Sequence, residues 1–192
     1  MKTILQVEDD PNDVLFLQRA MQKAGVVNPI QVVTDGQQAI DYLRGAGKFA
    51  DREVFPFPCL VLLDLKLPYV MGLEVLRWIS QQPEMALVVV LLTASSEEAD
   101  VAAAYRLGAK AFLTKPSELD TLLAMARAIK DFWLTYNVFP RQSLLPVPPE
   151  CVRLLPSGNS TFTVNCRLSL DEPLLRIEIP NSASPPRIKS RF

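Results

Sequence analysis

Residues 60–72 read LVLLDLKLPYVMG, and this stretch decides the fold. Four apolar residues run without alternation into Asp64, which is typical of a strand that helices cover on both faces. A short segment with a proline follows, and from Gly72 onward the apolar residues take helical spacing. The stretch therefore predicts a buried strand that ends on an acid and leads into a helix.

The same pattern of a strand followed by a helix occurs five times along the chain. Strands are predicted at residues 3–7, 30–33, 60–63, 88–92 and 111–114, and helices at 11–24, 37–43, 72–82, 97–107 and 118–134. Asp10, Ser95 and Ser117 stand where they would cap helices. Because crossovers between parallel strands are right-handed, the pattern predicts an α/β protein with a doubly wound parallel sheet.

The composition changes after Phe139. Nine of the 16 prolines lie in residues 140–192, and these residues carry net charge +3 against −4 for residues 1–139. We therefore predict one domain at 1–139 and a Pro-rich tail at 140–192, either poorly ordered or a small β-hairpin. The candidate strands of that hairpin are residues 162–170 and 174–179.

Composition also excludes several classes of function. The chain has no histidine, and its three cysteines have no metal-ligand spacing, which removes zinc and Cys-His catalytic sites. The net charge of −1 does not indicate the excess of positive charge that is typical of nucleic-acid-binding proteins. There is no stretch of about 20 apolar residues that would span a membrane and no signal peptide, so we expect a cytoplasmic protein.

Acids follow two of the predicted strands. Glu8 and Asp9 end the first strand and Asp64 ends the third, so all three belong at the carboxyl edge of the sheet, where ligands bind in this architecture. A single acid after a strand is more often a helix cap or a solvated loop residue. Three that converge would repel one another unless a hard divalent cation such as Mg²⁺ neutralised them. Thr93 and Lys115 end the fourth and fifth strands and add a hydroxyl and an ammonium at the same edge.

These motifs together resemble the receiver domain of two-component response regulators. The residues that carry the resemblance are Val7-Glu8-Asp9, Leu62-Leu63-Asp64, Leu67-Pro68 with Gly72, Leu92-Thr93-Ala94 and Lys115-Pro116. The resemblance spans residues 3 to about 135 and implies the flavodoxin-like (βα)5 fold with strand order 2-1-3-4-5. The long segment 43–58 and Phe132-Trp133-Leu134 are similar to the phytochrome-associated single-domain subfamily.

The resemblance implies a role for each matching residue. Asp64 would be the phosphoacceptor, forming an aspartyl phosphate with the help of Lys115 and Thr93. Mg²⁺ would be held by Glu8, Asp9, Asp64 and the backbone carbonyl of Lys66. Thr93, Ala94 and Phe112 would form the conformational switch, and the peptide between Lys115 and Pro116 would be cis.

The implied function is a single-domain response regulator in a phosphorelay, a phosphoacceptor that assists its own phosphorylation and dephosphorylation rather than an enzyme. Its partners would be a sensor histidine kinase, a phytochrome in the subfamily named above, and an unknown downstream protein, with neither DNA nor membrane bound. A homodimer would use the face built from residues 97–107, 111–114 and 118–134.

Three alternatives remain open at this point. An aspartyl-nucleophile phosphatase of the haloacid-dehalogenase kind also places an aspartate at a strand end with Mg²⁺, but its second aspartate is missing, because Leu65-Lys66 follow Asp64. A receiver-like binding module that is never phosphorylated would not need all of the acids, the threonine and the lysine. A flavin-binding flavodoxin fits the fold alone, and the acidic strand ends would repel its phosphate.

Overall fold

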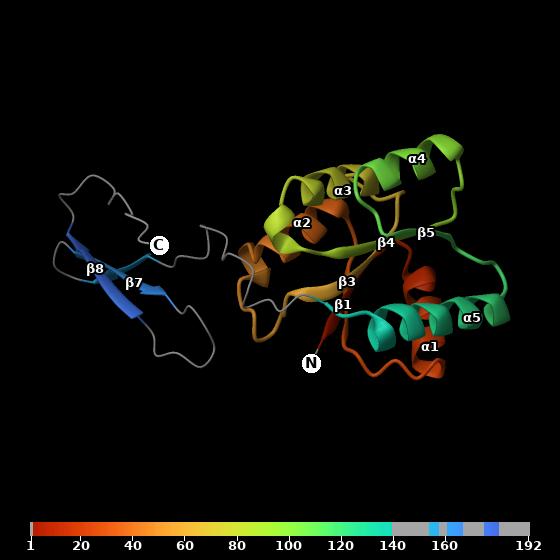
Figure 1. The fold of residues 1–192 in the computed structure, drawn as a ribbon, viewed down its shortest axis with the longest axis horizontal. Helices are drawn as coiled ribbons and strands as arrows, with labels where there is room; N and C mark the ends of the chain where they lie inside the picture. The colour runs from red at the N-terminus through yellow and green to blue at the C-terminus, as the bar shows by residue number, and fades with distance from the viewer. Residues whose placement is uncertain (1, 140–153, 158–160, 167–174, 181–192) are drawn as a thin grey trace. The chain divides into compact units, whose positions relative to one another are not determined.

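The computed structural model describes residues 2–139 and the strand residues 154–157, 161–166 and 175–180 (Figure 1). The chain divides into two units, Met1–Phe139 and Pro140–Phe192. The first unit contains the alternating strands and helices, and the second contains three further strands.

The first unit is built around a parallel sheet of five strands. They are β1 (Thr3–Val7), β2 (Ile30–Val33), β3 (Pro58–Leu63), β4 (Val88–Thr93) and β5 (Ala111–Thr114). Their order is β2-β1-β3-β4-β5, and each neighbouring pair is parallel. The predicted α/β class, doubly wound sheet and strand order are therefore confirmed. The order places β1 between β2 and β3, which brings the ends of β1 and β3 together.

Five helices cover the two faces of this sheet. They are α1 (Pro11–Lys23), α2 (Gly36–Arg44), α3 (Gly72–Ser80), α4 (Glu98–Arg106) and α5 (Leu119–Ile129), with short 3-10 turns η1 (Gly47–Phe49) and η2 (Pro83–Met85). In Figure 1, α2, α3 and α4 lie on one face of the sheet, and α1 and α5 lie on the other. Within the part of the chain that the structure describes, no helix has the length and apolarity needed to cross a membrane.

The helix ends confirm some sequence predictions and correct others. The Asp10 side chain accepts a hydrogen bond from the backbone N–H of Asn12 at 2.7 Å, so it caps α1 as predicted. Ser95 and Ser117 are not caps, because α4 begins at Glu98 and α5 at Leu119. The last helix also departs from α geometry after Ile129 and continues as a π-helical segment, η3 (Lys130–Tyr136), in which the Asn137 N–H bonds the carbonyl five residues back.

The uninterrupted apolar strands are explained by the two cores. Side chains alternate along each strand, so one set packs under α2, α3 and α4 and the other under α1 and α5. Leu5, Val61 and Leu91 belong to the first core, whereas Leu60 and Leu62 belong to the second. Residues 60–63 of β3 and 89–92 of β4 are therefore all apolar, because both faces of these strands are buried.

The segment between α2 and β3 is held by an aromatic cluster and an arginine. The rings of Tyr42, Phe49 and Phe55 lie 5.2–6.1 Å apart between centroids. The Arg52 guanidinium donates to the backbone carbonyls of Tyr42 and Leu43, each at 2.8 Å. These carbonyls end α2, so Arg52 satisfies groups that a helix terminus leaves without partners. The segment is thus anchored although it is long.

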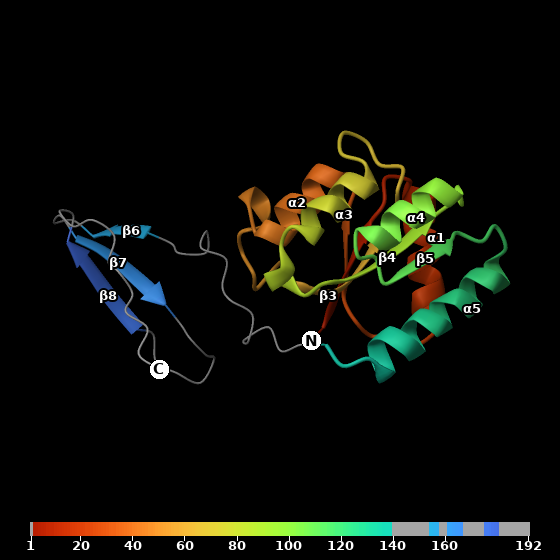
Figure 2. The same ribbon diagram turned by 45° about the horizontal axis from the view of Figure 1, so that its top comes forward.

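The second unit contains a three-stranded antiparallel sheet (Figure 2). Its strands are β6 (Leu154–Ser157), β7 (Thr161–Cys166) and β8 (Leu175–Pro180), with β7 in the centre. β7 and β8 overlap in part with the two strands expected of a hairpin, residues 162–170 and 174–179, and β6 is a third strand that the sequence did not predict. The turn expected at residues 171–173 lies outside the described residues.

Candidate functional site

The three acids predicted to converge do so at the carboxyl edge of the sheet. Glu8 and Asp9 follow β1, Asp64 follows β3, and these two strands are neighbours. Each acid offers one carboxylate oxygen, and the three oxygens lie within 4.8 Å of one another. Glu8 and Asp64 are 4% and 6% exposed, whereas Asp9 is exposed. The cluster therefore has a buried side and a side open to solvent.

Asp64 is fixed by hydrogen bonds to both of its carboxylate oxygens. Its Oδ1 accepts from the backbone N–H of Leu65 at 2.5 Å and from that of Lys66 at 3.3 Å. Its Oδ2 accepts from the Lys115 ammonium at 2.6 Å. The backbone N–H of Asp64 bonds the Val7 carbonyl, which ties Asp64 to the strand that carries the other two acids.

A close backbone approach at Gly72 supports this geometry. The backbone N–H of Gly72 donates to the Leu65 carbonyl at 2.9 Å. A Cβ atom at Gly72 would lie 2.1 Å from the Asp64 carbonyl oxygen and 2.7 Å from the Leu65 Cα. Only glycine lets the start of α3 lie this near the phosphoacceptor candidate, which gives the motif glycine a physical reason.

Lys115 connects four of the site's elements. Its Nζ lies 2.5 Å from Glu8 Oε2, 2.6 Å from Asp64 Oδ2 and 2.8 Å from Asp13 Oδ2. Asp13 lies in the first turn of α1 and was not among the site residues predicted from the sequence. Its position one helical turn after the acidic pair was the available signal. The ammonium therefore contacts Asp13 in addition to the two motif carboxylates, Glu8 and Asp64.

The peptide between Lys115 and Pro116 corrects one expectation. The resemblance implied a cis bond, but among the described residues the structure has no cis peptide, so this expectation is wrong. For an X-Pro bond the trans isomer is favoured by roughly 0.5–1 kcal/mol. Lys115 reaches its three carboxylates with that isomer, so the contacts seen here need no cis bond.

Burial and charge together shift two pKa values in the site. Burial raises the pKa of Glu8 to about 7; the hydrogen bond and charge of Lys115 lower it, and the charge of Asp64 raises it further. For Lys115, burial works to lower the pKa, but hydrogen bonds to Asp13, Asp64 and Glu8 outweigh burial and raise it. The lysine is therefore charged at neutral pH, while Glu8 is only partly ionised without further positive charge nearby.

The remaining predicted residues surround the cluster. Thr93 is fully buried, and its hydroxyl accepts a hydrogen bond from the Ser95 backbone N–H at 3.3 Å. Ala94 and Lys66 are exposed at the site's rim. Phe112 is half-buried and packs against the core under α2, α3 and α4. The threonine hydroxyl is thus engaged locally rather than with the acids, and the aromatic ring lies within a packed face.

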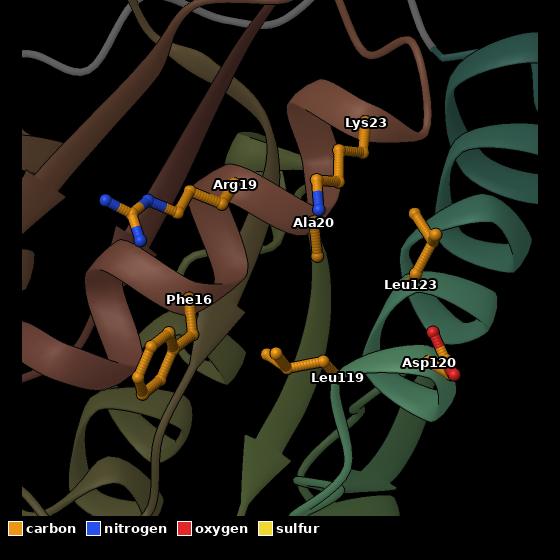
Figure 3. Close-up of a pocket in the computed structure, with 7 residues that line it drawn as sticks. All are labelled: Phe16, Arg19, Ala20, Lys23, Leu119, Asp120 and Leu123. Carbon is orange, nitrogen blue, oxygen red and sulfur yellow. The ribbon is translucent and has the colours of Figure 1, made fainter.

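A groove between α1 and α5 adjoins this edge (Figure 3). It has a volume of about 150 Å³ and is lined by Phe16, Arg19, Ala20, Lys23, Leu119, Asp120 and Leu123. Phe16 and Leu119 are 42% and 68% exposed. Phe16 also lines a smaller cavity of about 50 Å³ together with Glu8, Asp13 and Lys115. One aromatic side chain therefore borders both the groove and the acidic site.

The donor set fits a divalent metal ion. Glu8, Asp9 and Asp64 supply only carboxylate oxygens, the ligands that hard cations such as Mg²⁺, Ca²⁺ and Mn²⁺ take. Burial is the main cause of the raised pKa of Glu8, so a cation at the cluster would favour the ionised form of this carboxylate. Asp9 is exposed to solvent, so the cluster is open on this side to an ion that keeps part of its hydration shell.

Comparison with known proteins agrees with the fold. Residues 4–127 match the response regulator receiver domain family. The response regulator Rcp1 of Synechocystis sp. is 37% identical over 140 residues, which cover 72% of this chain and 93% of Rcp1. The probable methanogenesis regulatory protein FilR2 of Methanothrix harundinacea is 36% identical, with 71% and 86% covered.

Solved structures show the same relationship. The Mn²⁺-bound form of Rcp1 superposes with a TM-score of 0.67 at 37% identity, covering 73% of this chain and all of Rcp1. The phosphorylated cyanobacterial phytochrome response regulator RcpA gives a TM-score of 0.68 at 35% identity, with 73% and 99% covered. The resemblance to phytochrome-associated single-domain regulators is thereby confirmed as similarity. With its strand order, its acid-ended strands and this match, the chain belongs to the response regulator receiver domain family.

Proposed function

We propose that this chain is a single-domain response regulator whose Asp64 accepts a phosphoryl group from the phosphohistidine of a sensor histidine kinase. The observation that carries the proposal is the contact of Lys115 with Asp64 at 2.6 Å inside a cluster of three convergent acids. A buried carboxylate beside a fixed ammonium and a cation-binding donor set is suited to accept a phosphoryl group and to neutralise its charge.

The chemical step is an in-line displacement at phosphorus. An Asp64 carboxylate oxygen forms a bond to phosphorus, the bond from phosphorus to the histidine nitrogen breaks, and the electron pair of that bond leaves with the imidazole. Lys115 donates to the phosphoryl oxygens, and the N–H groups of Leu65 and Lys66 hold the carboxylate in place. No general base is needed, because the carboxylate itself is the nucleophile and has no proton to give up.

Mg²⁺ is the cation that we propose for this site, held by Glu8, Asp9, Asp64 and the carbonyl of Lys66. When bound, it supplies positive charge for the transferring oxygens. The support is the all-carboxylate donor set and the Mn²⁺ present in the Rcp1 structure, since both ions prefer oxygen ligands.

Readout of phosphorylation would use Thr93, Ala94 and Phe112. A phosphoryl group on Asp64 adds strong acceptor oxygens to which the Thr93 O–H could donate, and moving toward them would draw the Thr93 oxygen away from the Ser95 N–H. Ala94 is small enough to leave that space open. A shift of Thr93 would create room that Phe112 can fill, and the face of α4, β5 and α5 would change shape.

For the partner kinase we propose a phytochrome, because RcpA, at 35% identity, is described as a phytochrome response regulator. We propose that it docks at the α1–α5 groove, where Phe16 borders both the groove and the cavity next to Lys115. Phe16→Ala should slow transfer from the kinase at least about fivefold, because exposed aromatic residues are frequent interface anchors. Labelling by acetyl phosphate should be unchanged.

The matched control for this docking test is Leu15→Ala, which truncates another exposed side chain of α1 that does not line the groove. Equal slowing in both variants would contradict docking at the groove.

Output would be through protein contact in the cytoplasm, where ATP for the kinase is available, and without DNA or membrane binding. The α4–β5–α5 face is the candidate surface for a homodimer or a downstream protein. Residues 140–192 form a unit of their own that we regard as an accessory to the receiver at 1–139.

The decisive experiment is labelling of the full chain by acetyl phosphate in the presence and absence of Mg²⁺. We expect one stable phosphoryl group on the wild type and none on Asp64→Asn, with Asp120→Asn as a carboxylate control that still labels. Labelling of Asp64→Asn would move the phosphoacceptor elsewhere. Sustained turnover of phosphorylated metabolites would instead indicate a phosphatase.

A further inference from the structure

Of the three carboxylates that contact Lys115, two belong to the acid cluster and one does not. Glu8 and Asp64, which the ammonium meets at 2.5 and 2.6 Å, belong to the convergent acid cluster. Asp13, at 2.8 Å, lies 102 residues away in the chain, comes from α1, and is not part of that cluster. Its side chain is 42% exposed, against 8% for Asp64. Asp13 thus holds the lysine from outside the cluster.

We propose that Asp13 is a positioning residue that competes with the phosphoryl group for Lys115 and so slows phosphorylation of Asp64. The inference rests on the proposed function of Asp64. The transfer forms the bond between Asp64 oxygen and phosphorus and breaks the bond between phosphorus and the donor's oxygen or nitrogen, whose electron pair leaves with the donor. Asp13 takes no part in these bonds and acts through Lys115.

The number of N–H donors on Lys115 explains why Asp13 and a phosphoryl group would compete for it. A lysine ammonium has three N–H donors and no acceptor. In the structure it contacts three carboxylates, so each donor has an acceptor before any phosphoryl group arrives. Contact with a phosphoryl oxygen therefore requires Lys115 to give up or share a carboxylate.

Asp13 lies outside the set of acids that a bound cation would compensate. The site contains four carboxyl groups, those of Glu8, Asp9, Asp13 and Asp64, against the single ammonium of Lys115. Cation binding would compensate the three convergent acids, but Asp13 would keep its charge and its hold on the lysine.

The test compares Asp13→Asn with the wild type at saturating Mg²⁺, using acetyl phosphate and measuring the rate of labelling of Asp64. We expect labelling to become about fivefold faster, the scale of one partly exposed ion pair. The matched control is Asp10→Asn, which removes a neighbouring negative charge while asparagine preserves the helix cap, and which should change the rate less than about twofold.

A double-mutant cycle separates action through Lys115 from simple charge removal. In the Lys115→Met background, Asp13→Asn should accelerate labelling less than about twofold, because the competing lysine is gone. The same comparison can be made without a transfer step, with fluoroberyllate as an analogue of the phosphoryl group. Its affinity is measured by calorimetry for the wild type, Asp13→Asn, Lys115→Met and the double variant. Asp13→Asn should bind the phosphoryl analogue more tightly only when Lys115 is present.

Several results would overturn the proposal. Slower or unchanged labelling of Asp13→Asn in a folded protein would refute it, as would equal acceleration by Asp10→Asn or an acceleration that survives in Lys115→Met. If the wild type is labelled normally but Asp13→Asn does not change the labelling rate as expected, Asp64 remains the phosphoacceptor and only the role of Asp13 is refuted. If the folded wild type is not labelled at all, the proposed function fails and this inference fails with it.

Discussion

Replacing Gln6 by leucine should stabilise the receiver unit. Gln6 lies in β1 and is 2% exposed, yet neither its side-chain oxygen nor its side-chain nitrogen has a hydrogen-bond partner in the structure. The residues on its own face, Ile4 two positions earlier in β1 and Leu62 opposite it on β3, belong to the core under α1 and α5. A polar amide is therefore buried where the sheet would accept an apolar side chain of similar size.

The magnitude follows from the two unsatisfied atoms. Each buried donor or acceptor without a partner costs roughly 1–3 kcal/mol. Because the strand and its neighbours relax around a leucine only in part, we expect Gln6→Leu to raise the free energy of unfolding by about 2 kcal/mol, below the simple sum. With a urea m-value near 2 kcal/mol/M, the midpoint of unfolding moves up by about 1 M.

The assay is urea unfolding of the full chain followed by circular dichroism, with Gln31→Leu as the control. Gln31 lies in β2, opposite Leu5, but is only half-buried, so its amide remains accessible to water. We expect that control to change stability by less than about 0.5 kcal/mol. A loss of stability in Gln6→Leu would refute the reasoning, because it would mean that the Gln6 amide is satisfied, for example by a buried water.

Three further perturbations test the site and its support. Mg²⁺ affinity should fall about tenfold from pH 8 to pH 6, because the ion needs ionised Glu8 and the pKa of that group is raised to about 7. By the same linkage, the metal-free protein should lose stability as pH rises from about 4.5 to 7, since the unfolded carboxyl releases its proton first. Gly72→Ala should lower the free energy of unfolding by about 2 kcal/mol or more and slow labelling, because its Cβ would lie 2.1 Å from the Asp64 carbonyl oxygen. Arg52→Ala should cost about 1–3 kcal/mol and speed amide exchange in residues 45–57, because it removes charged hydrogen bonds to the carbonyls that end α2.

Calorimetric titration with Mg²⁺, urea unfolding and hydrogen exchange measure these effects in turn. A Mg²⁺ affinity that does not change between pH 6 and 8 would remove Glu8 from the metal site. Wild-type stability in Gly72→Ala would show that the backbone can move away from Asp64 at little cost. Unchanged exchange in Arg52→Ala would mean that the aromatic cluster alone holds the segment.

Much of the fold could be predicted because its signals are local. The strands at 3–7, 30–33 and 111–114 have the predicted bounds, since a short β-branched run between turn residues is a property of consecutive residues. The helix starts predicted at residues 97 and 118 are each one residue early, and the predicted caps Ser95 and Ser117 stand two and one residues before the observed N-caps. Capping depends on backbone dihedrals that packing sets, and Ser95 instead donates its N–H to Thr93.

The sequence by itself determined which strands end on Glu8, Asp9, Asp64 and Lys115, and the parallel arrangement then required these residues to share one edge. Only the tertiary structure decided how the charges pair there. The contact of Lys115 with Asp13 joins residues 102 positions apart, and it depends on how closely α1 packs beside the end of β5. An ion pair is sensitive to distances of a few ångströms, whereas the apolar pattern that orders the strands tolerates many small changes of packing. The apolar pattern of the sequence therefore determines the fold, whereas tertiary packing determines which carboxylates pair with Lys115.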